Sequence, residues 1–426
     1  MDPVAAALEK VAVRRPALID LGLDRVHRIL ARLGDPHRRL PPVFHVAGTN
    51  GKGSTCAYLR AILEASGARV HVFTSPHLVN YRERVVLAGS EISDAAFISA
   101  ITRVDEAAGA DDLTLFETIT CAAFAAFAET PADFLVLEVG LGGRLDATNV
   151  IDKPLAAVVT PIALDHQNFL GDTIAEIAGE KAGIFRRAAP AVVGPQTPEA
   201  MAVFERAAAR AGAGFFAHGT AWTAWAENGR LIYQDDIGLS DLSPPRLVGA
   251  HQFMNAALAV AAIRASGLPL TDEVLSAGLT SARWPARLQR LKTGPLVKAI
   301  GPRSELWLDG GHNPHAARAL ASALADFEEK NSRPLILIAG MQESKDAEGF
   351  FAAFAGLAST VFTVQADHAG ARTADDVARA AERAGIPAYP CGSLIEAASL
   401  ARGGGAARVL ICGSLYLAGE VLRQNG

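Results

Sequence analysis

Residues 44–55 read FHVAGTNGKGST, an apolar run that leads into a glycine-rich turn carrying Lys52. The residues that follow, 55–65, have the apolar spacing of a helix, so the predicted order is strand, turn, helix. Glycines let the backbone N–H groups of such a turn approach a triphosphate, and the helix N-terminus adds a favourable dipole. We therefore predict a nucleotide site in which Lys52 bridges the β- and γ-phosphates and Ser54 or Thr55 meets Mg²⁺.

The turn departs from the usual phosphate-loop spacing GxxxxGK[ST] in two places. Its first glycine is closer to the lysine, and Gly53 stands between Lys52 and Ser54. The alternative interpretation is a glycine-rich turn that only caps a helix. The order of strand, Gly-x-x-Gly-Lys and helix favours an ATP or GTP site over that alternative.

The composition describes an ordinary globular chain. Its 426 residues are enough for two or three domains, and 50% of them are hydrophobic, so a sizeable core can be buried. The formal net charge of −5 lacks the basic excess typical of a nucleic-acid binder. The four cysteines lie far apart and form no CxxC pair, which excludes a disulfide framework and a cysteine-based zinc site.

The sequence carries no pattern typical of export or membrane insertion. Residues 1–10 contain no basic segment followed by an apolar one, so we expect no secretory signal. The most apolar stretches, 119–128 and 256–263, are shorter than the roughly 18–20 residues of a spanning helix. We expect a soluble cytoplasmic protein with no membrane and no nucleic-acid partner.

Short apolar runs alternate with alanine-rich helical stretches through most of the chain. This alternation is typical of a parallel sheet with helices on both faces. Residues 215–247 differ, because tryptophans and other apolar residues stand among turn signals, and we expect a β-hairpin excursion there. A second strand–helix series begins near residue 296, so we place the domain boundary near residue 290.

The predicted fold class is therefore α/β. Residues 1–290 are expected to form a P-loop parallel-sheet ATPase domain, and residues 291–426 a smaller Rossmann-like α/β domain. The expected strands are residues 43–46, 70–73, 134–139, 156–160 and 191–193 in the first domain, and 305–308, 335–339, 361–364 and 409–412 in the second. The later helices are expected at residues 251–265, 272–280, 316–329, 347–358, 374–384 and 394–401.

Three polar clusters follow predicted strands, at the edge where open α/β sheets place their ligands, and they contain Ser75, Glu138 and His166. A carboxylate at the end of a buried strand is expected to be paired or bound to a metal. Mg²⁺ takes a few protein oxygens together with phosphate oxygens and water. Taken singly, the serine could cap a helix, the glutamate could pair with a buried arginine, and the histidine could be a core residue. Their shared position favours a magnesium site.

These motifs together resemble the folylpolyglutamate synthase/dihydrofolate synthase family, within the Mur ligase superfamily. The resemblance extends from about residue 19 to the last predicted strand and covers nearly the whole chain. The matching strings are HVAGTNGKGS (45–54), TSPHLVNYRERV (74–85), LEVGLGGRLDATN (137–149), ALDHQNFLG (163–171), GEKAGIFR (179–186), RWPARLQ (283–289) and DGGHNPHAA (309–317).

The resemblance implies a set of nucleotide contacts. The residues that would hold the ATP phosphates are Thr49, Asn50, Gly51, Lys52, Gly53 and Ser54. The family's further nucleotide contacts correspond to Asn255, Arg287 and Asp309 of this sequence. Asp309 would reach across from the second domain. His312 is a weaker candidate.

The resemblance also implies two Mg²⁺ ions, one bound by Ser75 and Glu138 and a second by His166. Lys181 stands before a glycine in the pattern of an ordinary helix end, where a lysine is expected to be exposed. The resemblance instead matches it to the family's carbamylated lysine. A carbamate replaces a cation by an anionic oxygen ligand that suits magnesium. Lys52, Lys181 and His166 are the expected catalytic residues.

The acceptor substrate is implied by three segments that resemble the pterin-binding parts of bifunctional bacterial members. Their residues are Ile19, Asp20 and Leu21, then Phe116 and Glu117, then Leu145, Asp146 and Ala147. The alternative for the first segment is a helix N-terminus that Asp20 caps.

The implied activity is ATP-dependent ligation of L-glutamate to dihydropteroate and to reduced folates, through an acyl phosphate, by a monomeric enzyme. The alternative within the family is a folylpolyglutamate synthase with a single activity. The peptidoglycan Mur ligases carry a UDP-sugar-binding domain before the phosphate loop, and only 44 residues precede His45 here. A binding module that had lost ligase chemistry would be expected to lack Glu138, His166 or Lys181, and all three are present.

Overall fold

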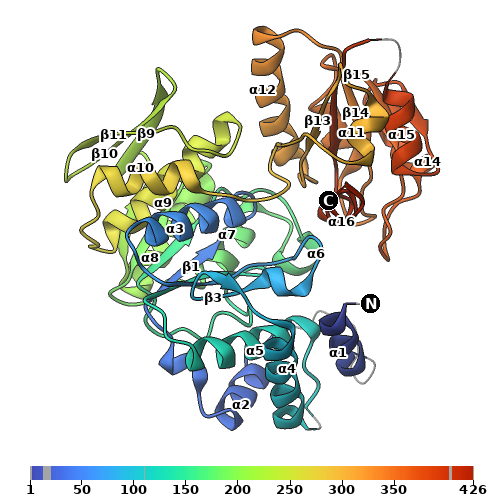
Figure 1. Ribbon diagram of the computed structural model, residues 1–426. Helices are drawn as coiled ribbons and strands as arrows, with labels where there is room; N and C mark the ends of the chain where they lie inside the picture. The colour runs from blue at the N-terminus through green and yellow to red at the C-terminus, as the bar shows by residue number, and fades with distance from the viewer. Residues whose placement is uncertain (1, 13–20, 110, 403–404, 426) are drawn as a thin grey trace. The chain divides into compact units, whose positions relative to one another are not determined.

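The structure is a computed structural model that describes residues 2–12, 21–109, 111–402 and 405–425. Its contacts divide the chain into two compact units. The N-terminal unit comprises residues 1–246 and 253–283, and the C-terminal unit comprises residues 247–252 and 284–426. The division therefore falls at Arg283, seven residues before the expected boundary near residue 290, and it assigns one short earlier segment to the C-terminal unit. Figure 1 shows the elements of both units.

An eight-stranded sheet forms the centre of the N-terminal unit, with the strand order β4-β3-β2-β5-β1-β6-β7-β8. Six of the strands pair in parallel, and β3 and β4 extend one edge in antiparallel fashion. The strands are β1 (Val43–Ala47), β2 (Val70–Phe73), β3 (Val85–Leu87), β4 (Ser90–Glu91), β5 (Phe134–Glu138), β6 (Ala156–Val159), β7 (Pro190–Val193) and β8 (Gly214–Ala217). Parallel β-strands and the helices between them confirm the predicted fold class.

The expected hairpin excursion is larger than a hairpin and starts later. Residues 214–217 are β8, the last strand of the main sheet, because their backbone continues the parallel pairing beyond β7. A separate three-stranded antiparallel sheet follows, made of β9 (Trp222–Glu227), β10 (Arg230–Asp235) and β11 (Leu239–Leu242). Asn228 and Gly229 both have positive φ in the turn between β9 and β10, as a tight hairpin requires.

Helices connect the strands of the N-terminal unit, and several begin at side-chain caps. Thr114 and Glu117 form a capping box at the start of α5, and Thr173 and Glu176 form one at α7. The helices are α1 (Pro3–Ala12), α2 (Asp24–Arg32), α3 (Lys52–Ala65), α4 (Asp94–Ala108), α5 (Leu115–Glu129), α6 (Gln167–Leu170), α7 (Ile174–Ala182), α8 (Pro198–Ala211), α9 (Ala250–Ala265) and α10 (Asp272–Ser281). Two single-turn 3₁₀ helices, Pro36–Arg39 and Tyr81–Arg84, lie in the connections.

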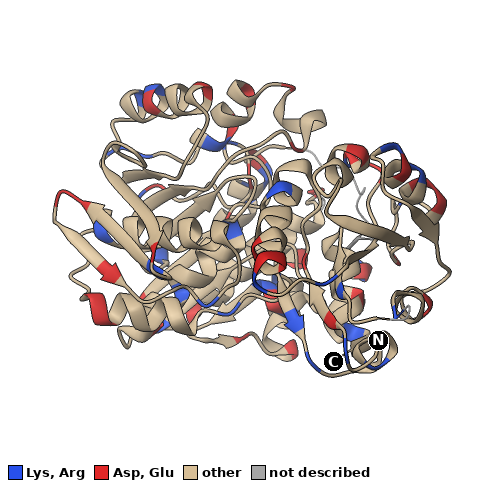
Figure 2. Ribbon diagram, turned by 90° about the horizontal axis from the view of Figure 1, so that it is seen from above, with Lys and Arg blue, Asp and Glu red and all other residues tan. Residues whose placement is uncertain are grey.

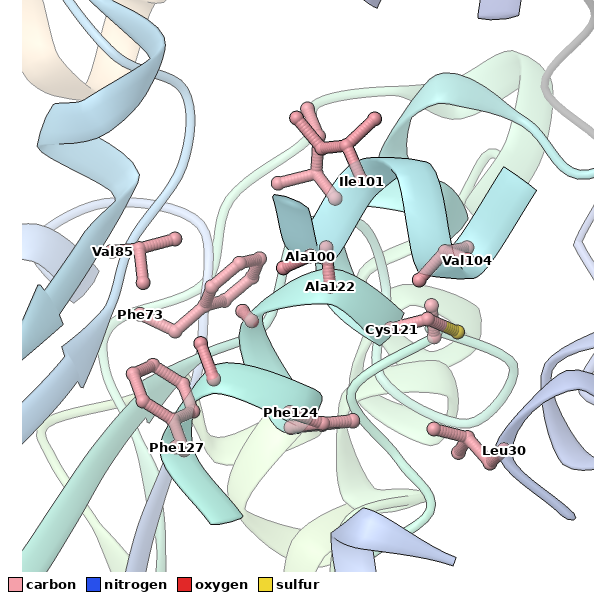
Figure 3. Packing of buried hydrophobic residues seen from close by; sticks show 14 of the residues in the cluster. Leu30, Phe73, Val85, Ala100, Ile101, Val104, Cys121, Ala122, Phe124 and Phe127 are labelled. Atoms are coloured by element: carbon pink, nitrogen blue, oxygen red, sulfur yellow. The ribbon is translucent and has the colours of Figure 1, made fainter. Parts of the chain in front are cut away.

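Helix α5 is the centre of the main hydrophobic core. Its side chains from Glu117 to Phe127 are all buried, so it is covered on every side. Figure 3 shows Phe124 and Phe127 of this helix among residues from other elements, including Leu30 of α2, Phe73 of β2 and Val104 of α4. Burial of one large apolar side chain contributes about 1.5–3 kcal/mol, so this cluster stabilises the elements on which the β2 and β5 loops are built.

The C-terminal unit is a six-stranded sheet with the order β12-β13-β17-β14-β15-β16, in which only β12 pairs antiparallel. The strands are β12 (Gln289–Leu291), β13 (Glu305–Leu308), β14 (Leu335–Ala339), β15 (Ala358–Thr363), β16 (Ala388–Pro390) and β17 (Arg408–Cys412). The helices are α11 (Pro295–Ile300), α12 (Pro314–Lys330), α13 (Ala347–Ala352), α14 (Ala374–Arg383), α15 (Leu394–Ala401) and α16 (Leu415–Asn425). The helix expected to reach residue 358 ends at Ala352, and Gly356 with a φ of 75° turns the chain into β15.

Charged residues of both signs are interspersed along the ribbon of the helices and loops, while most strands carry few (Figure 2). This distribution agrees with the absence of a basic excess in the composition. In the part of the chain that is described, no helix combines the length and the apolar character that a membrane crossing needs.

Candidate active site

The carboxyl ends of β2, β5, β1 and β6 lie side by side in the sheet. Glu138 at the end of β5 pairs with Val46 of β1, and Ala47 of β1 pairs with Val159 of β6. Phe73, the last residue of β2, pairs with Leu137. The loops that leave these four strands therefore start from one edge, where open α/β sheets bind ligands. The polar clusters predicted at separate strand ends are brought to this edge.

The turn of residues 48–51 needs its glycines. Gly48 has a φ of 144°, and a Cβ there would lie 1.8 Å from Thr160 Oγ1. Gly51 has a φ of 90°, and its Cβ would lie 2.4 Å from Asn255 Oδ1. The backbone N–H groups of Thr49 and Asn50 both donate to Pro161 O at 3.2 Å. The turn is thus fixed against the loop after β6 and against Asn255, one of the expected nucleotide contacts.

Helix α3 begins at Lys52, three residues earlier than the apolar pattern predicted. Its N-cap is Gly51 in the left-handed region, and no side chain caps the helix. The buried residues Gly53, Ser54 and Thr55 form its first turn. An uncapped N-terminus beside a glycine turn presents N–H groups to an anion, which is the arrangement expected of a phosphate site.

Two lysines donate to the same carbonyl oxygen of this turn. Lys52 Nζ lies 3.2 Å from Gly48 O and 3.5 Å from Thr49 O. Lys181 Nζ, at the end of α7, lies 2.9 Å from Gly48 O. The structure therefore brings Lys181 into contact with the turn of residues 48–51, called the phosphate turn below, although Lys181 is 133 positions from Gly48 in the sequence.

Lys181 is buried, with 4% of its surface exposed, so the expectation from pattern alone of an exposed helix-end lysine is wrong. Burial first, and the nearby charge of Lys52 second, lower the pKa of its amine to about 7. Two glycines permit the close packing. A Cβ on Gly143 would lie 2.8 Å from Glu180 O, and a Cβ on Gly183 would lie 2.4 Å from Arg144 Cβ. The last turn of α7 therefore sits directly against the loop after β5.

Glu138 is buried at the end of β5, and its Oε2 accepts a hydrogen bond of 2.9 Å from the backbone N–H of Ser75. Ser75 is half-buried at the start of the loop after β2. Ser75 and the Glu138 carboxylate are thus neighbours at one corner of the site. Among the described residues there is no group of three or more His, Cys, Asp or Glu side chains that could hold a metal alone. A carboxylate and a hydroxyl beside a phosphate turn fit Mg²⁺, which completes its shell with phosphate oxygens and water.

His166 is not a core residue. It has a φ of 53° at the N-terminus of the short helix α6, and 46% of its side chain is exposed. Its backbone N–H donates to Asp165 Oδ1 at 2.9 Å. Only 9% of the Asp165 side chain is exposed, and its charge raises the pKa of Lys181, against the effect of burial. Sequence reasoning proposed the histidine and overlooked this aspartate, although a carboxylate next to a histidine after a buried strand was a visible signal.

The three segments expected to bind the pterin differ in how exposed their side chains are and in whether these side chains already have partners. Phe116 lies over Gly140 in the loop after β5, where a Cβ would be 2.4 Å from its ring. The Glu117 carboxylate closes the capping box of α5 and pairs with Arg25 at 2.9 Å. The Asp146 carboxylate accepts from groups of its own loop. Leu21 and Leu145 are half-buried and Ala147 is buried, while Ile19 and Asp20 lie outside the described residues.

In the C-terminal unit, the expected nucleotide residues gather at the end of β13. Asp309 is buried and accepts from Leu288 N at 2.7 Å and from Gly311 N at 2.6 Å. Arg287 Nη1 donates to Ala286 O at 2.8 Å. His312 Nδ1 lies 2.9 Å from Gly310 O. These bonds fix the turns on both sides of Asp309.

Comparison with known proteins identifies both parts of the chain. Residues 46–263 match the Mur ligase middle domain, and residues 290–415 match the glutamate ligase domain of Mur ligases. The dihydrofolate synthase/folylpolyglutamate synthase of Escherichia coli is 41% identical over 350 residues, which are 82% of this chain and 79% of that protein.

Solved structures match over nearly the whole chain. The structure of Escherichia coli FolC in complex with DHPP and ADP has a TM-score of 0.89 and 35% identity, and the match covers 99% of this chain and 97% of that one. A bifunctional folylpolyglutamate synthase/dihydrofolate synthase with Mn, AMPPNP and L-glutamate bound has a TM-score of 0.86 and 34% identity, with 99% and 98% covered.

Proposed function

Because the chain belongs to the dihydrofolate synthase/folylpolyglutamate synthase family of the Mur ligases, we propose that it uses ATP to join L-glutamate to dihydropteroate and to reduced folates. The observation that carries the proposal is the meeting of Lys52, Lys181 and the phosphate turn beside Glu138 at one edge of the sheet. The reaction class is ATP-dependent acid–amino-acid ligation, with ADP and phosphate as products.

Ligation needs an activated acyl group, because a free carboxylate is a poor acylating agent. The acceptor carboxylate attacks the γ-phosphate in line and forms an acyl phosphate. The amine of L-glutamate then attacks the acyl carbon and expels phosphate. Enzymatic phosphoryl transfer depends mainly on positioning and on neutralising charge, and Lys52 at the phosphate turn is placed for both.

The residues of the site fit two magnesium ions. Ser75 and Glu138 would hold one, and His166 together with carbamylated Lys181 would hold the other. The carbamate fits this chain because an amine with a pKa of about 7 has a large neutral fraction at physiological pH, and the neutral amine is the form that reacts with CO₂. Bound magnesium would supply positive charge to the phosphate oxygens.

The remaining assignments follow the family pattern. We propose that Thr49, Asn50, Gly51, Gly53, Ser54, Asn255, Arg287 and Asp309 contact ATP, and that Ile19, Asp20, Leu21, Phe116, Glu117, Leu145, Asp146 and Ala147 form the pterin region. We also propose that residues 1–290 act as the ATP-binding domain and residues 291–426 as the glutamate-ligase domain.

We propose a cytoplasmic monomer that acts on small molecules. The four cysteines are free and buried, and burial raises the pKa of each thiol, which suits a reducing compartment. Gel filtration with light scattering tests the monomer, and a mass of twice the chain would contradict it.

Phosphate release with each acceptor tests the function. We expect ADP and phosphate only when L-glutamate and either dihydropteroate or tetrahydrofolate are both supplied. Activity on tetrahydrofolate alone would select the enzyme with a single activity. Tight ATP binding without turnover on either acceptor would select the binding module.

A further inference from the structure

A buried chain of hydrogen bonds joins strand β1 to the loop after β5. Thr148 Oγ1 lies 2.5 Å from Asp146 Oδ1 and 2.9 Å from His45 Nε2. All three residues are buried, with exposed fractions of 0% for Thr148, 3% for Asp146 and 1% for His45. None of the reaction steps above uses His45 or Thr148.

The hydrogen bonds of this network all point the same way, from His45 through Thr148 to Asp146. The hydroxyl of Thr148 donates to the carboxylate of Asp146, so its oxygen accepts from His45, which must carry its proton on Nε2. Burial lowers the pKa of His45 to about 3, so the imidazole is neutral and can carry its proton on either nitrogen. The hydrogen bond to Thr148 selects the Nε2–H form.

The Asp146 carboxylate, at the other end of the network, accepts hydrogen bonds from backbone groups of its own loop. Asp146 Oδ1 accepts from the backbone N–H of Thr148 at 3.0 Å, and Oδ2 accepts from that of Leu141 at 2.8 Å. Burial raises the pKa of Asp146, and these hydrogen bonds oppose that rise. The carboxylate therefore ties Leu141 to Thr148 and holds the loop of residues 140–148 in one conformation.

The loop of residues 140–148 belongs to the proposed acceptor-binding part of the site, whereas His45 lies in the strand that leads to the proposed ATP-binding turn. Gly140 in the loop supports the ring of Phe116, and Gly143 packs against the turn that contains Lys181. His45 lies in β1, three residues before the Gly48 of the phosphate turn. The chain of hydrogen bonds therefore connects the two halves whose relative placement must be right for in-line attack.

We propose that His45, Thr148 and Asp146 are positioning residues that fix the acceptor loop against the strand of the phosphate turn. The proposal rests on the proposed function and deepens it, since it gives His45 and Thr148 the role of holding the loop that carries Asp146 of the pterin region. Placement errors of about 1 Å can cost about 10²-fold in rate, so such a chain has a measurable effect on catalysis.

The test compares Thr148→Val, which keeps the shape and removes the hydroxyl, with Thr148→Ser, which keeps the hydroxyl. Losing a hydrogen bond to a buried carboxylate is expected to change acceptor use about tenfold or more. For Thr148→Val we expect that loss in kcat/KM for dihydropteroate, with the KM for ATP changed less than about twofold. Thr148→Ser should retain most of the wild-type kcat/KM for dihydropteroate.

Thr120→Val is the matched control, since Thr120 is a buried threonine whose hydroxyl donates to Phe116 O within α5. His45→Gln gives a second variant should Thr148→Val fail to fold, and it should show the same selective loss. Wild type and Thr148→Ser establish the ligase activity independently. Equal losses for Thr148→Val and Thr120→Val, or equal changes in both substrates, would overturn the positioning role while leaving the function intact.

Discussion

The amino nitrogens of Lys52 and Lys181 converge on one atom, the carbonyl oxygen of Gly48, at 3.2 and 2.9 Å. The charge of Lys52 disfavours a charge on Lys181, which is the more deeply buried of the two lysines. The buried one loses its charge more easily, so the pKa of Lys181 falls to about 7. The turn thus brings the side chain of Lys52 together with a buried amine whose lowered pKa leaves a large neutral fraction near pH 7.

Lys52→Ala should abolish ligation and leave the fold intact, because this half-buried side chain, among the described residues, donates to the turn and fills no core position. Loss of one charge-stabilising group typically costs roughly 10²–10³-fold in kcat. Steady-state phosphate release and the thermal unfolding midpoint are the measurements. Turnover near that of wild type in the folded variant would remove the assignment of residues 48–54 as the phosphate site.

Lys181→Ala and Lys181→Arg should both be severely impaired, because neither side chain can supply carbamate oxygens. A short carboxylic acid added to Lys181→Ala should restore part of the activity by standing in for the carbamate. The direct measurement is electron density at neutral pH in a bicarbonate-equilibrated crystal. An unmodified lysine in an active sample would end the carbamate assignment.

Carbamate formation should depend on pH with a midpoint near 7 in the metal-free protein, because only the neutral amine reacts. At fixed dissolved CO₂ we expect modification to increase from pH 6 to pH 8 and to level off above that, following the pKa of Lys181. Carbon-13 NMR with labelled CO₂ measures this. A rise only above pH 9 would indicate an ordinary exposed lysine.

Much of the fold follows from local sequence pattern, and the exceptions have physical causes. The strands 43–46, 70–73 and 305–308 are found within one residue, since a short apolar run between turns has few other conformations. The strands β12 and β16 were missed because each has three residues and no apolar periodicity. Residues 215–217 were assigned to the hairpin excursion and not to the main sheet, because pairing with β7 is a tertiary property.

The site was predictable where it lies at strand ends. The phosphate turn, Ser75, Glu138 and His166 all come to the edge that strand ends share. Lys181 was not predictable from its pattern, since its burial depends on Gly48, 133 positions away. Only the family resemblance proposed it as a site residue. The partners of Asp146 were missed for the same reason, whereas Asp165 was overlooked although it stands directly before His166 in the sequence.

His45→Gln should flatten the pH dependence of stability between pH 6.5 and about 4. Unfolded histidine binds a proton near pH 6.5, whereas folded His45 does so only near its pKa of about 3. The unfolded state therefore binds more protons in this window, and the wild type loses stability as the pH falls, by about 1.4 kcal/mol per pH unit from this one group. Urea unfolding at pH 7, 6, 5 and 4 measures the difference. Parallel curves for wild type and variant would contradict the buried, neutral histidine.

The central claim is that one edge of the N-terminal sheet activates a carboxylate by phosphorylation. Dihydropteroate labelled with ¹⁸O in its carboxylate tests it most directly. Attack on the γ-phosphate followed by displacement with L-glutamate leaves one carboxylate oxygen on the phosphate, so we predict one ¹⁸O atom in each phosphate released, scaled to the labelling. Unlabelled phosphate released at the same rate as product would contradict the claim, because water and not the acceptor would then have taken the phosphoryl group.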